Sequence, residues 1–339
     1  MARFSAFVFL LITSASAYSQ KSYFHQDFTG NGPFVSSNPN SGQFSHILET
    51  VPKLSFHEFH QGYMDLIRSE QDSATGGIIR VMKATPFSPN PETLFIQMKI
   101  SVEEMQTNSL NAMYFYVGEN FSTTNNSFPS NALMFGRFSI HFQGSTFVLR
   151  DLETQTTSKA IPVTTPITLT WALNNSDNEQ AYKLTKSASA EHSVKPKTYD
   201  LWIDDEAVKL QIPAYPGSSF YSHTKLSNFE MRFRNGVGKI RIYGLLITDA
   251  QESLAPDSFA TATIYPTPAS PQFIHLKADN IDPTSFQLRD SFGRSIGVDV
   301  KMESGNMANV YPKQFVSSGI YILSYYQDNR QRHVRVMVD

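Results

Sequence analysis

Short runs of alternating hydrophobic and polar residues recur along the first three quarters of the chain. Such alternation puts apolar side chains on one face of a β-strand. Turn-forming clusters rich in Asn, Pro, Ser and Gly interrupt the runs at 38–42, 88–91 and 235–238, and the last of these predicts a hairpin. The expected strands cover residues 77–82, 94–100, 112–117, 137–142, 167–173, 199–203, 229–233 and 239–247.

The series contains no convincing amphipathic helix of ten or more residues, so the strands need no helical crossovers and should pair antiparallel. We therefore expect an all-β fold that begins with an antiparallel β-sandwich of the jelly-roll type. After a polar stretch at 251–258, alternation resumes in shorter units at 273–276, 285–289, 297–302, 319–325 and 332–338. Units of this length predict a small immunoglobulin-like β-sandwich.

The first residues predict export. Met1 to Arg3 form a short basic start, residues 4–12 are almost wholly apolar, and residues 15–17 read ASA. This order is typical of a signal peptide cleaved after Ala17, and the apolar run is too short to span a bilayer. The expected organisation is thus a signal peptide at 1–17, a sandwich at 18–250, a linker at 251–263 and a C-terminal domain at 264–339.

Composition narrows the functions. The chain has 339 residues, a formal net charge of −2 and no cysteine. The charged residues form no long run of one sign, so a nucleic-acid partner is not expected. The lack of cysteine excludes disulfides, thiolate metal sites and cysteine nucleophiles.

Three segments near the C-terminus carry a family likeness. Residues 264–270 read IYPTPAS, 286–294 read FQLRDSFGR and 318–323 read SGIYIL. In this order they resemble the opening, middle and late motifs of the type A C-terminal sorting domain of the bacterial type IX secretion system. The residues that match these motifs are Tyr265, Pro266, Pro268, Asp290, Gly293, Arg294, Gly319 and Tyr321.

The resemblance implies a route and partners. An outer-membrane translocon would read the domain, and a sortase would remove it. The product would then be released or attached to cell-surface lipopolysaccharide, so we expect an extracellular or outer-membrane-surface location. We expect Gly293 and Gly319 to adopt positive φ angles at turns. The pattern leaves open whether Tyr321 or Ile322 faces the core.

A second likeness lies in the first sandwich. Residues 199–208 read YDLWIDDEAV and resemble a strand–turn–strand unit of concanavalin-like and laminin-G-like jelly rolls, and 239–249 resemble their late strand. The likeness implies fold, and a carbohydrate ligand only by analogy. Such folds also hold a structural Ca²⁺, although no acidic loop here has the ligand spacing for one.

Alternation also selects candidate ligand-binding side chains. Trp202 lies opposite the apolar face of 199–203, and Arg137, His141 and Gln143 lie opposite the apolar face of 137–142. Tyr114 and Tyr116 share one face of their strand. Aromatic rings flanked by hydrogen-bonding groups suit sugar rings. These six residues are the predicted ligand-binding set, with packing of Trp202 under a loop as the alternative, whereas Trp171 is expected in the core.

Catalytic patterns are lacking. The sequence contains no E-x-D-x-E string, no H-E-x-x-H and no G-x-S-x-G, and the acids at 204–206 are expected at a hairpin tip. We therefore expect a non-enzymatic, carbohydrate-binding protein with no cofactor. Two alternatives stay open, namely a polysaccharide-active hydrolase or lyase and a structural surface or matrix protein.

Overall fold

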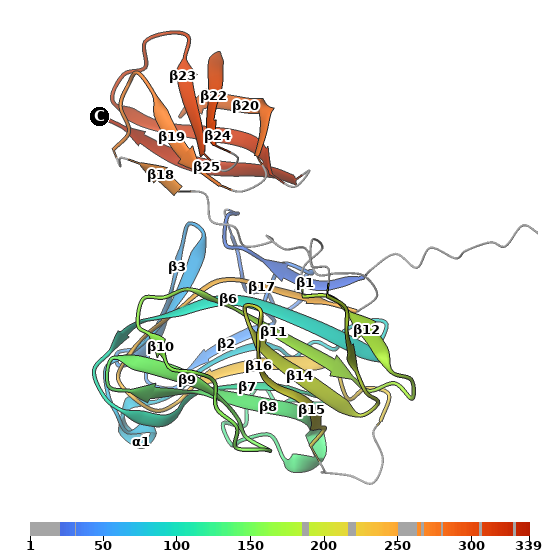
Figure 1. The fold of residues 1–339 in the computed structure, drawn as a ribbon. Helices are drawn as coiled ribbons and strands as arrows, with labels where there is room; N and C mark the ends of the chain where they lie inside the picture. Colours follow the sequence, from blue (N-terminus) through green and yellow to red (C-terminus); the bar gives the residue numbers. More distant parts are fainter. Residues whose placement is uncertain are drawn as a thin grey trace, which may run out of the picture.

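The computed structural model describes residues 21–30, 32–184, 190–215, 222–249, 263–265, 268–278, 281–304, 307–327 and 330–339. These residues form two β-sandwiches, one from residues before 250 and one from residues after 262 (Figure 1). The all-β fold with a small second sandwich was thus predicted correctly. The predicted signal peptide and all of the predicted linker except Thr263 lie outside the described residues.

The large sandwich has two antiparallel sheets. The eight-stranded sheet has the order β15-β14-β11-β6-β17-β4-β3, with β1 added along β17. Its strands are β1 (Ser22–Gln26), β3 (Ser55–His60), β4 (Tyr63–Arg68), β6 (Thr93–Met105), β11 (Ile167–Asn174), β14 (Thr198–Ile203), β15 (Glu206–Pro213) and β17 (Gly238–Thr248).

The seven-stranded sheet has the order β10-β9-β8-β7-β16-β5-β2. Its strands are β2 (His46–Glu49), β5 (Ile79–Lys83), β7 (Ser109–Gly118), β8 (Met134–Gln143), β9 (Thr146–Asp151), β10 (Ile161–Pro162) and β16 (Asn228–Phe233). A separate hairpin of β12 (Gln180–Tyr182) and β13 (His192–Val194) lies beside the eight-stranded sheet. Among the described residues of this sandwich, the other regular elements are the single turns α1 (Ser73–Gly76) and η1 (Asn131–Leu133).

Alternate side chains of both sheets form the core between them. Trp171 of β11 is fully buried, as predicted, and its ring meets Phe138 of β8 edge-on at a centroid distance of 4.9 Å. Gly136 of β8 is required at this point, because a Cβ there would lie 2.9 Å from the Trp171 ring and 3.0 Å from the Tyr199 ring. Aromatic packing across the sheets therefore decides the residue type at Gly136.

All eight strands expected in the large sandwich form, but the hairpin expected at 235–238 does not. β16 lies in the seven-stranded sheet and β17 in the eight-stranded sheet, so this segment is an arch between the sheets. The backbone N–H groups of Arg234 and Asn235 both donate to the carbonyl of Ala112, at 2.9 and 3.2 Å, beside β7. Alternation shows which side of a strand faces the core, and it does not show which sheet the strand joins.

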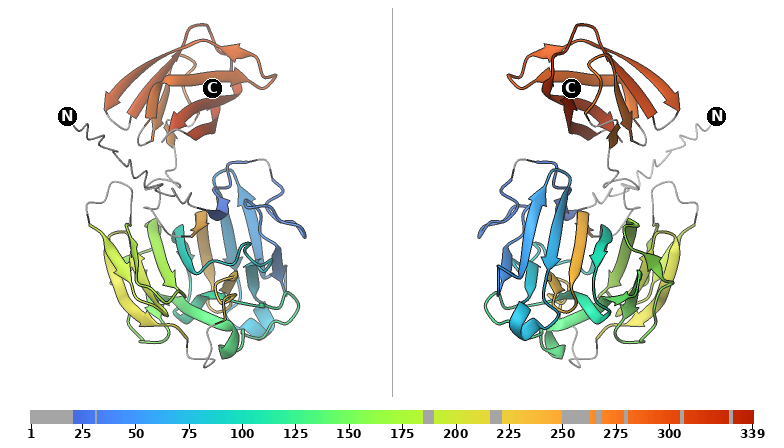
Figure 2. Two further views of the ribbon diagram at one scale, coloured as in Figure 1. Left: turned by 90° about the vertical axis from the view of Figure 1, so that its right-hand side faces the viewer. Right: turned by 90° about the vertical axis from the view of Figure 1, so that its left-hand side faces the viewer.

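The small sandwich packs two four-stranded sheets, of orders β18-β19-β23-β22 and β21-β20-β24-β25. Its strands are β18 (Thr263–Tyr265), β19 (Ile274–Lys277), β20 (Ile281–Asp290), β21 (Ser295–Ile296), β22 (Val298–Ser304), β23 (Met307–Pro312), β24 (Gly319–Gln327) and β25 (Arg330–Val338). Tyr321 faces its core at 6% exposure, whereas Ile322 is 37% exposed. Views from two opposite sides show the small sandwich above the large one (Figure 2).

The sequence DSFGR at 290–294 forms a self-contained turn. The Asp290 carboxylate accepts the backbone N–H groups of Phe292 and Arg294, each at 2.9 Å, and pairs with the Arg294 guanidinium at 2.7 Å. Gly293 has the expected positive φ, 80°. Gly319 also has a positive φ, 159°, and it is the first residue of β24.

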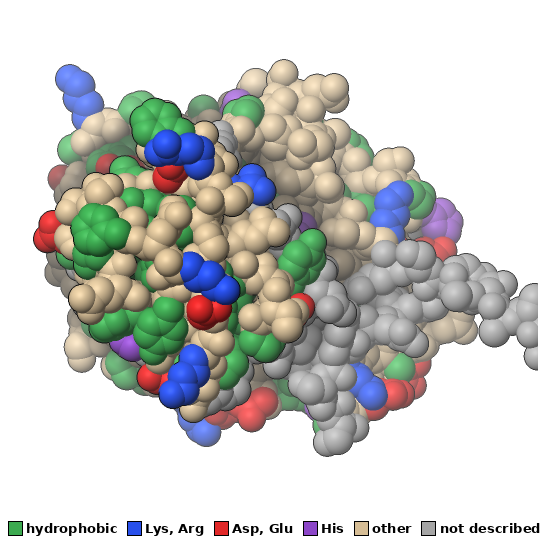
Figure 3. Space-filling view, turned by 90° about the horizontal axis from the view of Figure 1, so that it is seen from above, with side chains coloured by type: hydrophobic (Ala, Val, Ile, Leu, Met, Phe, Trp, Pro, Cys, Tyr) green, Lys and Arg blue, Asp and Glu red, His purple; other side chains and the backbone are tan. Residues whose placement is uncertain are grey.

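An ion pair of 2.8 Å joins Arg332 of the small sandwich to Asp27 of the large one. On the face of the molecule seen from above, hydrophobic side chains stand among charged ones (Figure 3). Within the described ranges, no helix is long and apolar enough to cross a membrane.

Candidate functional site

The candidate site lies on the outer face of the seven-stranded sheet, the face turned away from the core. Cross-strand pairing lines up polar and aromatic side chains there in two adjacent rows. One row runs from Arg80 through Arg232, Tyr114 and Ser139 to Arg150. The other runs from Met82 through Glu230 and Tyr116 to Arg137. The rows thus place four arginines and two tyrosines on five neighbouring strands.

A buried ionic triad anchors one end of the rows. Arg80 binds both carboxylate oxygens of Glu230, with its Nε 3.1 Å from Oε1 and its Nη2 3.0 Å from Oε2. Arg232 donates from Nε to the same carboxylate at 2.6 Å. All three side chains are buried. Two guanidinium groups share one carboxylate, so this part of the face carries one excess positive charge.

The loop at 119–133 covers this triad. Arg80 donates to the carbonyls of Ser122 at 2.7 Å and Asn125 at 2.8 Å, and Arg232 donates to the carbonyl of Asn126 at 3.1 Å. Carbonyl dipoles therefore solvate the excess charge in place of water. Gly118 lets the loop fold back, because a Cβ there would lie 2.2 Å from the Leu133 carbonyl oxygen.

Next to the loop the face stays partly open around Tyr114, which is half-buried. The Tyr114 ring stacks on Tyr116 at 5.8 Å and meets Phe128 of the loop edge-on at 5.1 Å. Phe128 is 42% exposed, and Arg234 lies over its ring at 4.5 Å. Burial raises the pKa of Tyr114, while the positive charges of Arg234, Arg137 and Arg232 act to lower it.

Arg137 lines the open area from the other side. Its Nε pairs with Glu153 at 2.9 Å, its Nη2 donates to the Tyr215 hydroxyl at 3.0 Å, and its guanidinium lies 4.2 Å from the Tyr215 ring centre. These three contacts hold the side chain in one place, with 26% of it exposed. A fixed, half-open guanidinium beside aromatic rings can donate hydrogen bonds to a bound hydroxyl or anion.

His141 belongs to a buried polar cluster on this face. Its Nε2 lies 2.6 Å from Oδ1 of Asn111 and 3.1 Å from Oγ of Ser139, and Ser139 itself donates to Asn111 at 2.8 Å. Burial and, secondly, the charge of Arg150 lower the pKa of His141 to about 4. With Asn111 accepting from Nε2, that nitrogen carries the proton and takes none from Ser139. The cluster positions side chains and contains no activated nucleophile.

The structure places five of the six predicted residues on this face, namely Tyr114, Tyr116, Arg137, His141 and Gln143, with Arg137 and Gln143 near opposite ends of β8. Tyr116 and His141 are buried there, whereas Gln143 is exposed at the end of β8. The sixth residue, Trp202, lies on β14 of the other sheet.

Trp202 is 5% exposed and packs beneath the β12–β13 hairpin. Its indole N–H donates to the Tyr182 hydroxyl at 2.8 Å, and that hydroxyl donates to Asp200 at 2.6 Å. His192 lies against the indole at 4.5 Å. The surroundings of Trp202 match packing under a covering segment, the alternative that the sequence left open.

Sequence reasoning missed Arg80, Glu230 and Arg232, although a signal was present. Each alternates with core residues in the runs IIRVM and FEMRF, so its outward direction could be predicted. Phe128 and Arg234 had no such signal, because they lie outside regular strands.

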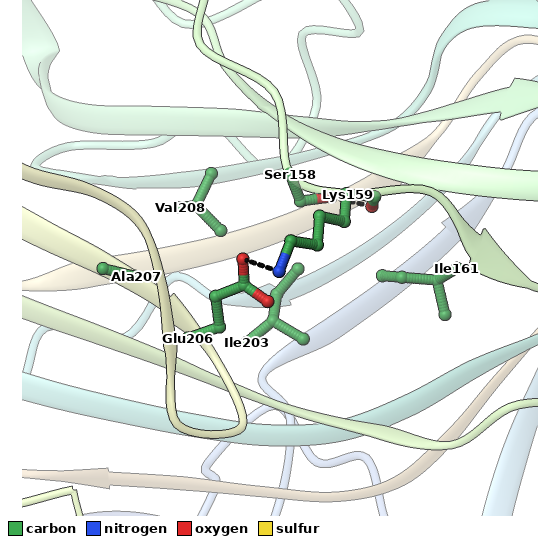
Figure 4. Close-up of a pocket in the computed structure, with 7 residues that line it drawn as sticks. All are labelled: Ser158, Lys159, Ile161, Ile203, Glu206, Ala207 and Val208. Atoms are coloured by element: carbon green, nitrogen blue, oxygen red, sulfur yellow. Dashed lines mark hydrogen bonds and ion pairs between the residues drawn. The ribbon is translucent and has the colours of Figure 1, made fainter.

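A small pocket lies elsewhere, at the edge of the eight-stranded sheet. It is lined by Ser158, Lys159, Ile161, Ile203, Glu206, Ala207 and Val208 (Figure 4). Lys159 and Glu206 form an ion pair of 2.8 Å, and their side chains are 80% and 55% exposed. No group of three or more His, Asp or Glu side chains placed to hold a metal ion occurs within the described part of the chain.

The chain was compared with protein-family models, curated protein sequences and solved structures. No protein-family model and no curated protein sequence matches this chain. Among solved structures, it is similar to the carbohydrate esterase vb_24B_21 of Shiga toxin-encoding bacteriophage phi24B. The identity is 8%, 69% of this chain and 100% of that chain are covered, and the TM-score is 0.38.

Two other matches are the metal-free VIP36 exoplasmic/lumenal domain and the potassium-bound form of the Emp46p carbohydrate recognition domain. For VIP36 the identity is 9%, the coverage 71% and 96%, and the TM-score 0.39. For Emp46p the identity is 10%, the coverage 61% and 90%, and the TM-score 0.37. At these TM-scores the likeness assigns no ligand or activity to the chain.

Proposed function

We propose that this chain is an exported, non-enzymatic protein whose large sandwich binds a carbohydrate on the outer face of the seven-stranded sheet. The observation that carries the proposal is the arrangement around Tyr114. The half-buried Tyr114 ring meets the exposed Phe128 edge-on and stacks on Tyr116, and the cross-strand partner of Tyr116 is Arg137 with its fixed guanidinium. Such rings accept a sugar face, and the guanidinium donates to ring substituents. The proposed site contains Tyr114, Arg137 and Gln143, with the buried Tyr116 and His141 on the same face of the same strands.

A glycan array with matched tyrosine variants tests this proposal. Tyr114→Leu keeps apolar bulk and removes the ring and hydroxyl, so we expect about tenfold weaker binding of any glycan that the wild type binds. Tyr63→Leu is the control, because Tyr63 is a half-buried tyrosine on the outer face of the other sheet. Unchanged binding by Tyr114→Leu with weakened binding by Tyr63→Leu would contradict the proposal, because the glycan would then bind the eight-stranded sheet.

The two alternatives from the sequence have different outcomes in the same screen. Hydrolysis or elimination of a polysaccharide by the purified protein would favour an enzyme. An array without any bound glycan would favour a structural surface or matrix protein. The Ser139–His141 pair does not favour the enzyme, because both side chains are buried and both bond Asn111.

For the small sandwich we propose a type IX sorting role, with a translocon and a sortase as partners. The ordered motifs support it, and so does the exposed outer face of the β20–β24–β25 sheet. Ile320 and Met337 are directly paired on this face and are 41% and 47% exposed. Exposed apolar side chains on neighbouring strands are typical of a surface that another protein binds. Pro266 of the opening motif lies outside the described residues, and the side chain of Tyr265 is not described.

With this role we propose two cleavages. Residues 1–17 are removed on export, and residues 264–339 are removed at the cell surface. The remaining sandwich would be released or attached to lipopolysaccharide. Intact-mass measurement of the secreted protein tests both cleavages. A secreted product that still contains residues 264–339 would contradict removal of the tail, and secretion unchanged by deleting 264–339 would contradict the sorting role.

A further inference from the structure

We infer that the ligand of the seven-stranded sheet is an anionic polysaccharide, one whose carboxylate or sulfate groups are bound by the arginines that surround Tyr114. This inference rests on the proposed carbohydrate-binding function and specifies the class of carbohydrate. Its basis is a charge imbalance on one face of a protein whose formal net charge is −2.

The imbalance is visible in a count of the charged side chains on this face. Among the described residues, the arginines are Arg80, Arg137, Arg150, Arg232 and Arg234, and the carboxylates that pair with them are Glu153 and Glu230. Five positive charges thus face two negative ones, which leaves an excess of three. His141 adds no charge near neutral pH, because its pKa is lowered to about 4.

Two of the surplus arginines are in the open part of the face. Arg234 packs on the exposed Phe128 ring, and Arg150 bonds the neutral amide of Gln155. Both are half-buried, and within the described ranges neither has a carboxylate at ion-pair distance. Each guanidinium therefore keeps donors for an anion from solvent.

The positions of these arginines suit an extended ligand better than a single ion. Arg234 follows β16 and Arg150 lies on β9, with β7 and β8 between the two strands. Three strand spacings separate the two strands by roughly 14 Å. Tyr114 and Arg137 lie on the strands between, so a chain of sugar rings crossing the strands would meet a cation, aromatic rings and further cations in turn.

Binding of three defined polysaccharides by the purified protein tests the inference. Polygalacturonate presents carboxylates, dextran sulfate presents sulfate esters, and dextran is neutral. We expect binding of one or both anionic polymers, no competition by dextran, and weaker binding as NaCl increases, because salt screens exposed charges. Comparing the two anionic polymers identifies which anion the arginines recognise.

Charge-neutralising variants locate the site. Arg234→Gln and Arg150→Gln should each weaken anionic binding by about tenfold, because each removes a charge-assisted contact. Lys209→Gln is the control, since Lys209 is an exposed cation on β15 of the other sheet and should change binding less than about twofold. Thermal unfolding of each variant checks that the fold is kept.

The outcomes separate this inference from the function on which it rests. Binding of neutral glycans alone, weakened by Tyr114→Leu, would overturn the anionic ligand and keep the carbohydrate-binding function. No binding of any glycan would overturn both. Equal weakening by Arg234→Gln and Lys209→Gln would show a general charge effect and would also overturn the inference.

Discussion

The outer faces of the two sheets in the large sandwich contain similar residue types and differ in charge balance. On the eight-stranded sheet, Arg241 pairs with Asp65 at 2.8 Å and lies 3.6 Å from Glu103, and Lys239 pairs with Glu104 at 3.0 Å. On the seven-stranded sheet, five arginines share two glutamates. Cross-strand ion pairs neutralise these charges on the first face. The second face keeps cationic donors for something outside the protein.

The two faces also differ in how their aromatic residues are covered. Trp202 lies under a hairpin and bonds Tyr182, so its indole is not offered to a ligand. Tyr114 is bordered by Phe128 of the 119–133 loop and stays half open. Residue type alone therefore does not mark a binding surface; the segment that crosses above the strand decides which rings remain accessible.

The largest effect should come from breaking the ionic triad. Glu230→Ala leaves two guanidinium groups buried without their carboxylate, and we expect a loss of about 3–5 kcal/mol in the free energy of unfolding. Urea denaturation measures it. Replacing Arg80 and Arg232 with Met and Glu230 with Leu together should restore only part of the loss, because the loop carbonyls that accept from the two arginines then lack donors. A loss below about 1 kcal/mol for Glu230→Ala would mean that the triad is hydrated and that the loop does not seal it.

Acidification should weaken the seven-stranded sheet through His141. Its pKa is about 4 in the folded protein and about 6.5 when unfolded, so the unfolded chain binds more protons between these values. Stability should therefore fall as the pH is lowered from about 6.5 towards 4, by about 1–3 kcal/mol from this group. His141→Gln should show a smaller fall over the same range. Parallel pH profiles for wild type and variant would contradict a buried neutral His141.

A smaller effect is expected at the covered face. Tyr182→Phe removes the hydroxyl that accepts from Trp202 and donates to Asp200, so two buried polar groups lose a partner. We expect a loss of about 1–3 kcal/mol in the free energy of unfolding, with glycan binding unchanged. If Tyr182→Phe instead altered glycan binding, the ligand would contact the Trp202 face, and the difference drawn between the two sheets would be wrong.

The smallest effect is expected at the balanced part of the eight-stranded face. Glu104→Gln removes the partner of Lys239 at a site where the Glu104 side chain is 53% exposed. Solvent screens such pairs, so the free energy of unfolding should change by less than about 0.5 kcal/mol. Thermal unfolding of Glu104→Gln and Glu230→Ala, measured in parallel, compares the loss of an exposed ion pair with the loss of a buried triad.

The sequence predicted the strands well and the site in part. Alternation predicted all eight expected strands of the large sandwich. It put Arg137, His141 and Gln143 on the outward side of their strand, and Tyr114 and Tyr116 on one shared face of theirs. It could not show that Trp202 and Tyr114 belong to different sheets, because strand order depends on contacts far apart in sequence. Nor could it show the coverings. The 119–133 loop and the β12–β13 hairpin are held by backbone carbonyls and buried side chains that have no periodic signature.

Hydrogen–deuterium exchange with and without a bound polysaccharide tests the central claim most directly, because it reports on both faces in one experiment. Polygalacturonate or dextran sulfate, whichever binds, is added to saturation. We predict slower exchange in peptides covering 109–143 and 228–234, with residues 63–68 and 238–248 unchanged. Slower exchange confined to 63–68 and 238–248 would contradict the account, because the ligand would then occupy the balanced face.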